Sequence, residues 1–347
     1  MERISLRICS KAPLRISFAG GGTDVPPYPE LHGGAVISST IDRYAYVSLE
    51  PRKDEKVVIR SLDFDIVSIL DSIAEVRYDG NLDFAKAVIR TMGKPAEGLN
   101  IHISCNAPPG SGLGSSSALI VGVVGAMKHL HDQALTSYEI ADTAYRIERE
   151  ELKIRGGMQD QYAATFGGLN FIEFKADGVV VNPLRIRPEI LNELSTHLVL
   201  CNTGRTRLSS KILSRQIRSY ENGDEFVLKN LEGLKRLAFK LKDSLLKGQV
   251  EKIGPLLDED WELKRQLDSK ISTPFLDRVS KIAKASGASG GKILGAGGGG
   301  YFLFYCNPEH RPKLEKSLKS AGCALENFSF EPNGLQTWKV NEKGVVS

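Results

Sequence analysis

The stretch from Pro108 to Ala118, Pro-Pro-Gly-Ser-Gly-Leu-Gly-Ser-Ser-Ser-Ala, has the residue types of an anion-binding loop, and we call it the serine loop. Its three glycines can adopt positive φ and bring the backbone close to a ligand. Ser115, Ser116 and Ser117 add hydroxyls beside the free N–H groups of a helix start. A helix N-terminus favours negative charge, so we expect the loop to bind phosphate. The alternative is a Gly/Ser loop with an ordinary serine cap.

Two further glycine turns each present a carboxylate. Gly-Gly-Gly-Thr-Asp, residues 20–24, follows an extended segment and ends in Asp24, while Gly156 and Gly157 come shortly before Asp160. Asp24 is placed to hold a ligand hydroxyl, and Asp160 presents an acid at the start of a short helix. A turn cap for Asp24 and a helix N-cap for Asp160 are the structural alternatives.

A third glycine run, Lys292 to Gly300, satisfies the spacing Gly-x-Gly-x-x-Gly at Gly295, Gly297 and Gly300. A dinucleotide site needs a strand before this motif and a helix after it. The pattern predicts a helix before and a strand after, so we do not expect dinucleotide binding. Residues 110–117 are not a Walker A motif, because they contain no lysine.

The whole-chain composition is that of an ordinary globular protein. The 347 residues are 41% hydrophobic and 25% charged with a net charge of +4, which favours neither a nucleic-acid nor a membrane partner. Five cysteines lie far apart, so neither a disulfide framework nor a cysteine metal site is predicted. The N-terminus lacks an apolar signal core, and the longest apolar run, Ala118 to Met127, is too short to span a bilayer, so we expect a cytoplasmic protein.

Around these motifs, the patterns predict an α+β chain. Residues 4–62 alternate apolar and polar positions in several runs typical of a sheet, and a strand over 99–105 leads into the serine loop. The predicted helices are 82–92, 118–127, 136–152, 209–220, 225–246, 253–267, 274–286 and 308–318. Pro183 and Pro188 mark a boundary, which predicts domains at 1–185 and 186–347.

Together the motifs resemble the GHMP kinases, which phosphorylate small molecules. The first family motif matches residues 12–24, the phosphate motif Pro109 to Ala118, the catalytic segment Gly157 to Gln161, and the third motif Lys292 to Gly300. They occur in the family order along nearly the whole chain. The resemblance implies an N-terminal domain like ribosomal protein S5 domain 2, a ferredoxin-like C-terminal domain, and an active site between them.

Within that family the sequence departs from the galactokinases, which have Gly-Glu-His-Thr-Asp-Tyr where this chain has Gly-Gly-Gly-Thr-Asp-Val. It looks most like the branch of D-glycero-D-manno-heptose 7-phosphate kinases and fucose kinase domains, whose members phosphorylate an anomeric hydroxyl using ATP and Mg²⁺. The expected acceptor is therefore the heptose 7-phosphate. Fucose or another sugar is the alternative within the family, and a non-catalytic sugar or ATP sensor is the alternative outside enzymes.

The resemblance also implies roles for individual residues. Asp160 would accept or orient the proton of the sugar hydroxyl, and Arg15 would keep Asp160 ionised and offset charge in the transition state. The expected metal ligands are Ser116, Ser117 and Glu150, with Glu148 as second choice. The expected nucleotide-binding residues are Pro109, Gly110, Ser111, Gly112, Leu113, Gly114, Ser115, Ser116 and Ser117. The expected substrate-binding residues are Gly20, Gly21, Gly22, Thr23, Asp24, Gly157, Gln161, Arg155, Arg205, Gly297 and Gly298.

A phosphorylated sugar needs a cation for its second phosphate. The candidates near the motifs are Arg43, Arg155, Arg205 and Arg207. The helical segment 205–267 is expected either to form a homodimer contact or to complete the sugar pocket, and the sequence leaves both open.

Overall fold

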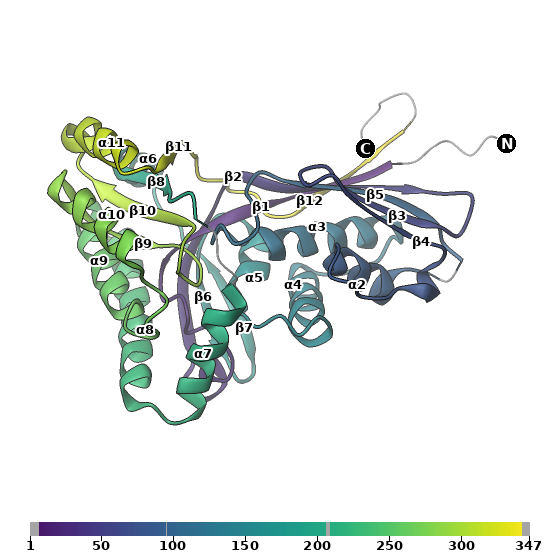
Figure 1. The fold of residues 1–347 in the computed structure, drawn as a ribbon, viewed down its shortest axis with the longest axis horizontal. Helices are drawn as coiled ribbons and strands as arrows, with labels where there is room; N and C mark the ends of the chain where they lie inside the picture. The colour runs from purple at the N-terminus through teal and green to yellow at the C-terminus, as the bar shows by residue number, and fades with distance from the viewer. Residues whose placement is uncertain (1–6, 95, 206–208, 342–347) are drawn as a thin grey trace.

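The computed structural model describes residues 7–94, 96–205 and 209–341, which form two β-sheets with helices packed against them (Figure 1). The larger sheet has the strand order β12-β1-β2-β5-β3-β4, and β6 and β7 extend it from β2. Among its described strands, β3 and β5 pair in parallel and every other pair is antiparallel. Its strands are β1 (Arg7–Ala19), β2 (Gly34–Pro51), β3 (Val57–Ser61), β4 (Ile66–Leu70), β5 (Leu99–Cys105), β6 (Leu169–Lys175), β7 (Gly178–Pro183) and β12 (Gln336–Val340).

The helix α3 (Ser115–Leu130) packs against β1 and β2 and is buried along most of its length. The Ser10 hydroxyl of β1 donates to the Gly122 carbonyl at 2.7 Å. A Cβ at Gly122 would lie only 3.0 Å from Val47 Cγ2, so glycine lets the helix sit close to the sheet. The helix predicted at 118–127 is therefore confirmed, and it begins three residues earlier, directly after the serine loop.

The other helical segments of the N-terminal half are α1 (Tyr28–His32), η1 (Ile73–Glu75), α2 (Asp83–Met92), α4 (Ser137–Arg146), the π-helical turn η2 (Ile147–Glu151) and α5 (Gln159–Phe166). Of these, α2, α4 and α5 pack against α3 (Figure 1), whereas α1 packs against β6. A capping box begins α4, because the side chains of Thr136 and Glu139 each bond to the other residue's backbone N–H.

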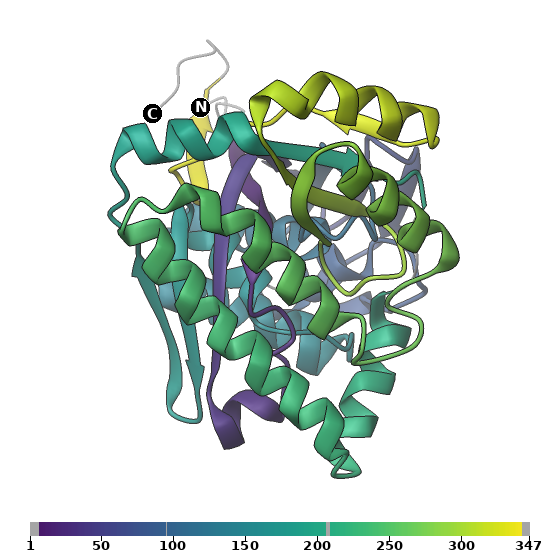
Figure 2. The same cartoon turned by 90° about the vertical axis from the view of Figure 1, so that its left-hand side faces the viewer.

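The smaller sheet has the order β11-β8-β10-β9. Figure 2 views the helices of this half, among which α8 and α9 run side by side. The elements are α6 (Pro188–His197), β8 (Leu198–Asn202), α7 (Ser209–Glu221), α8 (Glu225–Leu246), η3 (Val250–Lys252), α9 (Ile253–Lys264), α10 (Pro274–Ala285), β9 (Ala288–Ile293), β10 (Tyr301–Cys306), η4 (Pro308–His310), α11 (Arg311–Ser320) and β11 (Ala324–Glu326).

The element before the third glycine run differs from the prediction. The strand β9 leads into the run, where a helix was expected. Its sequence, Ala-Ser-Gly-Gly-Lys-Ile, carries little strand pattern. The segment is extended because β10 pairs with it and α9 packs directly on its backbone, where a Cβ at Gly290 would collide with the Gly254 carbonyl. The strand β10 follows the run as predicted, so the strand and helix order of a dinucleotide fold is absent here.

The chain returns to the larger sheet at its end. The strand β12 pairs with β1, and the N–H of Glu331 donates to the Thr40 carbonyl at 3.0 Å. The division at residue 185 stays a prediction, with the addition that residues 336–340 lie beside the N-terminal sheet. Within the described ranges, every helix is too short or too polar to cross a lipid bilayer.

Candidate active site

A cavity of about 440 Å³ lies where the predicted motifs meet. The first glycine turn and the serine loop line it from the N-terminal half, and Leu213, Gln216, Lys264, Gly295 and Ala296 line it from the C-terminal half. The size is within the range of small-molecule sites. The motifs that are far apart in the sequence therefore form one site between the two halves of the chain.

The serine loop presents the N-terminus of α3 to this cavity. Gly114, with φ +77°, is the N-cap and has no side chain to satisfy the first-turn N–H groups. The loop residues that line the cavity are Pro109, Gly110, Gly112, Gly114, Ser115, Ser116 and Ser117. Ser111 and Leu113 are buried instead and hold the loop, since the Leu113 carbonyl accepts from the Arg15 N–H at 3.0 Å.

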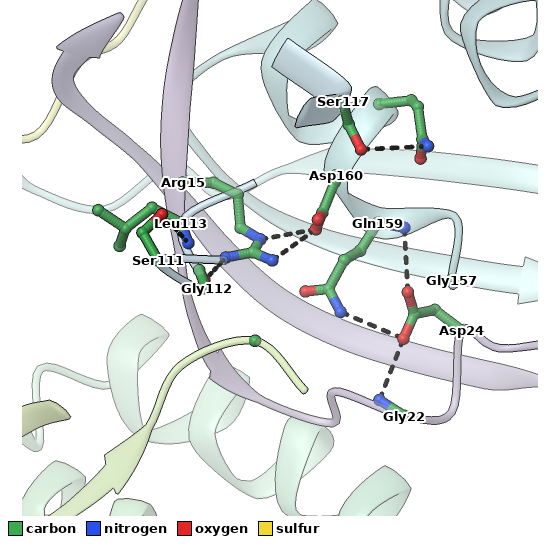
Figure 3. Close-up of polar contacts among 12 residues, drawn as sticks. Arg15, Gly22, Asp24, Ser111, Gly112, Leu113, Ser117, Gly157, Gln159 and Asp160 are labelled. Atoms are coloured by element: carbon green, nitrogen blue, oxygen red, sulfur yellow. Dashed lines mark hydrogen bonds and ion pairs between the residues drawn. The ribbon is translucent and has the colours of Figure 1, made fainter. Parts of the chain in front are cut away.

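Arg15 and Asp160 form an ion pair beside the loop (Figure 3). The guanidinium Nε donates to Asp160 Oδ1 at 2.7 Å, and Nη1 donates to the Gly112 carbonyl at 2.5 Å. Arg15 is almost fully buried, whereas 21% of the Asp160 side chain is exposed. Asp160 lies in the first turn of α5 and lines the cavity, so its carboxylate is held in place and still reachable by a ligand proton.

The Asp24 carboxylate lies in the same cavity and is 1% exposed. It accepts from the N–H of Gly22 and from the N–H and Nε2 of Gln159 at 3.1 to 3.2 Å (Figure 3). A Cβ at Gly157 would collide with this carboxylate, which explains the glycine there. Asp24 thereby joins the first glycine turn to the start of α5.

Two predicted substrate residues of the first turn do not line the cavity. The Thr23 hydroxyl donates to the carbonyls of Gly20 and Ala35 and also accepts from the Ala35 N–H. The N–H of Gly20 donates to Asp260 Oδ1 at 3.0 Å. Gly20 and Thr23 therefore shape the turn, while Gly21, Gly22 and Asp24 face the cavity.

The structure brings Glu148, not Glu150, to the serines. Glu148 Oε1 accepts from the Ser116 hydroxyl at 3.1 Å, and Oε2 accepts from the Ser117 hydroxyl at 2.7 Å. Glu150 is exposed and does not line the cavity. Residues two apart on a helical turn point in nearly opposite directions, so only one of the two can reach α3. Of the two glutamates expected as metal ligands, Glu148, the second choice, is therefore the one that lies beside the serines, and the role of metal ligand stays a prediction.

Other predicted substrate residues also have structural contacts. Gln161 is fully buried and donates to Glu148 Oε2 at 2.6 Å. Arg205 stacks over the Phe275 ring at 4.1 Å and lies outside the cavity lining. Gly297 and Gly298 pack on Ile271, and the Gly298 N–H donates to the Ile271 carbonyl. None of these four residues lines the cavity.

Of the four candidate arginines, Arg155 is the one that the structure places in the cavity lining. It is exposed, and no described residue forms a hydrogen bond or an ion pair with its side chain. Arg43 pairs with Glu326 at 3.5 Å and donates to the Asn327 carbonyl. Arg207 lies outside the described residues.

Sequence reasoning missed Lys264, which lines the cavity from α9. Its Nζ donates to the Gly295 carbonyl at 2.5 Å. Burial and the charge of nearby Lys292 lower the pKa of Lys264 to about 7. A signal was available, because Lys264 continues the apolar positions Leu257 and Trp261 at helical spacing. Further lining residues that were not among the expected site residues are Ser17, Gln159, Gln216, Leu213 and Arg149.

Comparisons with known proteins agree with this geometry. Family models described as the N-terminal and C-terminal domains of GHMP kinases match residues 82–168 and 241–323. The chain is 37% identical, over 96% of its length and 99% of the relative's, to D-glycero-alpha-D-manno-heptose 7-phosphate kinase from Campylobacter jejuni. It is 29% identical, over 90% of its length, to L-fucokinase/L-fucose-1-P guanylyltransferase from Bacteroides fragilis, of which it spans 36%.

A solved structure supports the same match. The crystal structure of a D-glycero-D-manno-heptose 1-phosphate kinase from Bacteroides thetaiotaomicron superposes with a TM-score of 0.81 and 31% identity, covering 95% of this chain and 98% of that one. The expected two-domain α+β fold is confirmed by these matches.

Proposed function

Since the chain belongs to the GHMP kinase family and is an ATP-dependent sugar kinase, we propose that it phosphorylates the C1 hydroxyl of D-glycero-D-manno-heptose 7-phosphate. The product would be the 1,7-bisphosphate, for GDP-heptose and surface-polysaccharide biosynthesis. The observation that carries this proposal is the 37% identity to a kinase named for that substrate, over nearly both whole chains. The free Arg155 in the cavity lining supports a phosphorylated acceptor.

We assign the β- and γ-phosphates of ATP to the serine loop. The uncapped first turn of α3 supplies backbone N–H donors, and the positive end of the helix dipole stabilises the phosphates. Arg15 lies beside the loop through its bond to the Gly112 carbonyl, so its charge is available to the transferring phosphoryl group.

We assign the acceptor's C1 hydroxyl to Asp160. The carboxylate orients this hydroxyl and accepts its proton as the bond to phosphorus forms. The ion pair with Arg15 keeps the carboxylate in one position between loop and acceptor. Positioning is the main requirement, because phosphoryl transfer proceeds through a loose transition state with modest demand for a base.

The residues at the start of α3 fit a magnesium ion. Ser116, Ser117 and Glu148 offer hydroxyl and carboxylate oxygens, the ligand atoms that Mg²⁺ prefers, and each serine hydroxyl already lies within hydrogen-bond distance of the Glu148 carboxylate. Gln161 fixes the carboxylate from behind. When bound there, the ion would neutralise charge on the phosphates of ATP.

The loop assignment predicts that Gly112→Val abolishes nucleotide binding while the fold survives. Gly112 has φ +83°, and its Cβ would lie 2.5 Å from the Leu294 carbonyl oxygen, so valine forces the loop away from the third glycine run. Calorimetry with a non-hydrolysable ATP analogue measures the binding, and circular dichroism checks the fold. Unaltered affinity would mean that the nucleotide binds elsewhere.

The acceptor assignment predicts a selective effect of Arg155→Ala. Loss of one charge-assisted contact should lower kcat/KM for heptose 7-phosphate about ten- to a hundredfold. It should leave kcat/KM for unphosphorylated heptose unchanged. Arg146→Ala is the control, because Arg146 pairs with Asp142 on the exposed surface of α4. The heptose phosphate assignment would be wrong if fucose or galactose gave the higher kcat/KM and Arg155→Ala caused no selective loss for the phosphorylated sugar. The kinase activity itself would stand.

The alternative functions have separate tests. A coupled assay for ADP release against a panel of sugars distinguishes an enzyme from a sensor and ranks fucose against the heptoses. The Arg15 and Asp160 ion pair and the open serine loop favour turnover. A cytoplasmic location and a homodimer stay predictions.

A further inference from the structure

Three polar side chains converge on Gly21 in the cavity wall. A Cβ on Gly21 would lie 3.5 Å from Ser17 Oγ, 3.7 Å from Gln159 Nε2 and 3.7 Å from Lys264 Nζ. All four residues line the cavity, and the side chains come from three separate elements, β1, α5 and α9. The glycine therefore leaves a space about the size of a methyl group at the centre of a polar cluster.

The cluster has unused hydrogen-bonding capacity. The buried Ser17 hydroxyl and Gln159 Oε1 have no hydrogen-bond partner among the described residues. Lys264 Nζ, with three N–H groups, donates only to the Gly295 carbonyl within the same part of the chain. Buried polar atoms are nearly always paired, so two unpaired groups beside an ammonium with spare donors in a cavity lining point to a ligand that satisfies them.

The charges around the cluster balance when Lys264 is protonated. The three cations Arg15, Lys264 and Lys292 then stand against the three anions Asp24, Asp160 and Asp260. Two of these six groups form the Lys292 and Asp260 pair at 2.8 Å, and another two form the Arg15 and Asp160 pair at 2.7 Å. A balanced site with spare donors and acceptors suits an uncharged polyol better than a phosphate. Arg155 remains for the charged end of the acceptor.

We propose that Ser17, Gln159 and Lys264 bind hydroxyls of the acceptor's sugar ring, as a specificity subsite around Gly21. Lys264 donates to a ring hydroxyl, Gln159 Oε1 accepts from one, and Ser17 does either. The inference rests on the proposed sugar acceptor and adds its orientation: the ring lies on this cluster and the phosphate points to Arg155. It applies equally to whichever sugar the enzyme uses best.

The experiment compares Ser17→Ala and Lys264→Met with the control Ser38→Ala. Ser38 is the cross-strand partner of Ser17, is equally buried with an unpaired hydroxyl, and does not line the cavity. Calorimetry of acceptor binding should show a ten- to hundredfold loss for Lys264→Met and a loss of several fold for Ser17→Ala. The factor should be the same for phosphorylated and unphosphorylated forms of the sugar, and affinity for an ATP analogue should not change.

A second variant keeps the test valid if Lys264→Met does not fold. Gly21 has no strained φ and its Cβ makes only ordinary contacts, so Gly21→Ala should keep the wild-type melting temperature. Its methyl group should weaken acceptor binding at least tenfold. If the folded variants bind the acceptor with wild-type affinity, the proposed subsite is wrong. If affinity falls only for phosphorylated sugars, Lys264 binds the phosphate and not a ring hydroxyl. A wild-type protein that binds no sugar would instead refute the proposed function.

The pH dependence gives an independent readout for Lys264. Its pKa of about 7 means that the ammonium donor is present below pH 7 and lost above it. The groups that act on Lys264 are Lys292 and Arg15, which lower its pKa, and Asp260 and Asp24, which raise it. Affinity for an unphosphorylated sugar should therefore fall several fold between pH 6 and 8, and Lys264→Met should remove this dependence. An unphosphorylated sugar is required, because a phosphate itself titrates near pH 6.

Discussion

Replacing Asp160 by Asn should lower kcat by about 10²- to 10⁴-fold and leave the affinity for ATP nearly unchanged, because the amide cannot accept the acceptor's proton. The carboxylate is paired with Arg15 at 2.7 Å and faces the cavity, whereas the phosphates of ATP are assigned to the serine loop. The substitution therefore acts on the chemical step. Steady-state kinetics with a coupled ADP assay and calorimetry with an ATP analogue separate the two effects.

The control for this experiment is Asp142→Asn. Asp142 is a surface residue of α4 that pairs with Arg146 and has a half-exposed side chain. Its replacement should leave kcat within a factor of two, which is the usual outcome for exposed surface pairs. Normal turnover by the Asp160→Asn variant would remove Asp160 from the mechanism and leave Arg15 and the serine loop as its protein components.

The second large effect is expected for Glu148→Gln, with a loss of about a hundredfold in kcat/KM at limiting Mg²⁺. The amide loses the negative charge that a magnesium ion needs, and its NH₂ group would face the donating groups of Ser117 and Gln161. Titrating activity with Mg²⁺ should show a metal requirement shifted to higher concentration. The melting temperature of the unliganded variant, compared with that of the wild type, separates a lost metal site from a destabilised fold.

Glu150→Gln is the matched control, because the same change is made two residues away on the same turn. Glu150 is exposed and outside the cavity lining, so its replacement should leave both kcat and the Mg²⁺ requirement unchanged. The reverse result, a strong effect at Glu150 and none at Glu148, would show that the carboxylate bound to the serines has only a structural role.

Local pattern was enough to predict most of the helices and the loops that carry chemistry, although it missed α1 and α6. Glycines followed by serines and a continuous apolar run predicted the serine loop and α3, because backbone freedom and burial are read directly from residue type. The same applies to α8 (Glu225–Leu246), whose apolar spacing gave both ends correctly. The order of the motifs further predicted the family, and with it the pairing of Arg15 with Asp160.

Long-range contacts decided what the pattern could not. The strand β9 has almost no strand-forming residues and is extended only because β10 and α9 enclose it, and β12 returns to pair with β1 at the far end of the chain. Neither contact leaves a periodic signal, since each depends on a partner distant in sequence.

The details of the site were decided in the same way. The orientation of one helical turn selects Glu148 over Glu150, a difference of two residues that no spacing rule resolves. Lys264 reaches the cavity because α9 places it beside the third glycine run. The sequence by itself determined the kinds of chemistry and the elements that carry them. Only the tertiary structure decided which side chains share the cavity, because that depends on the packing of segments more than 100 residues apart.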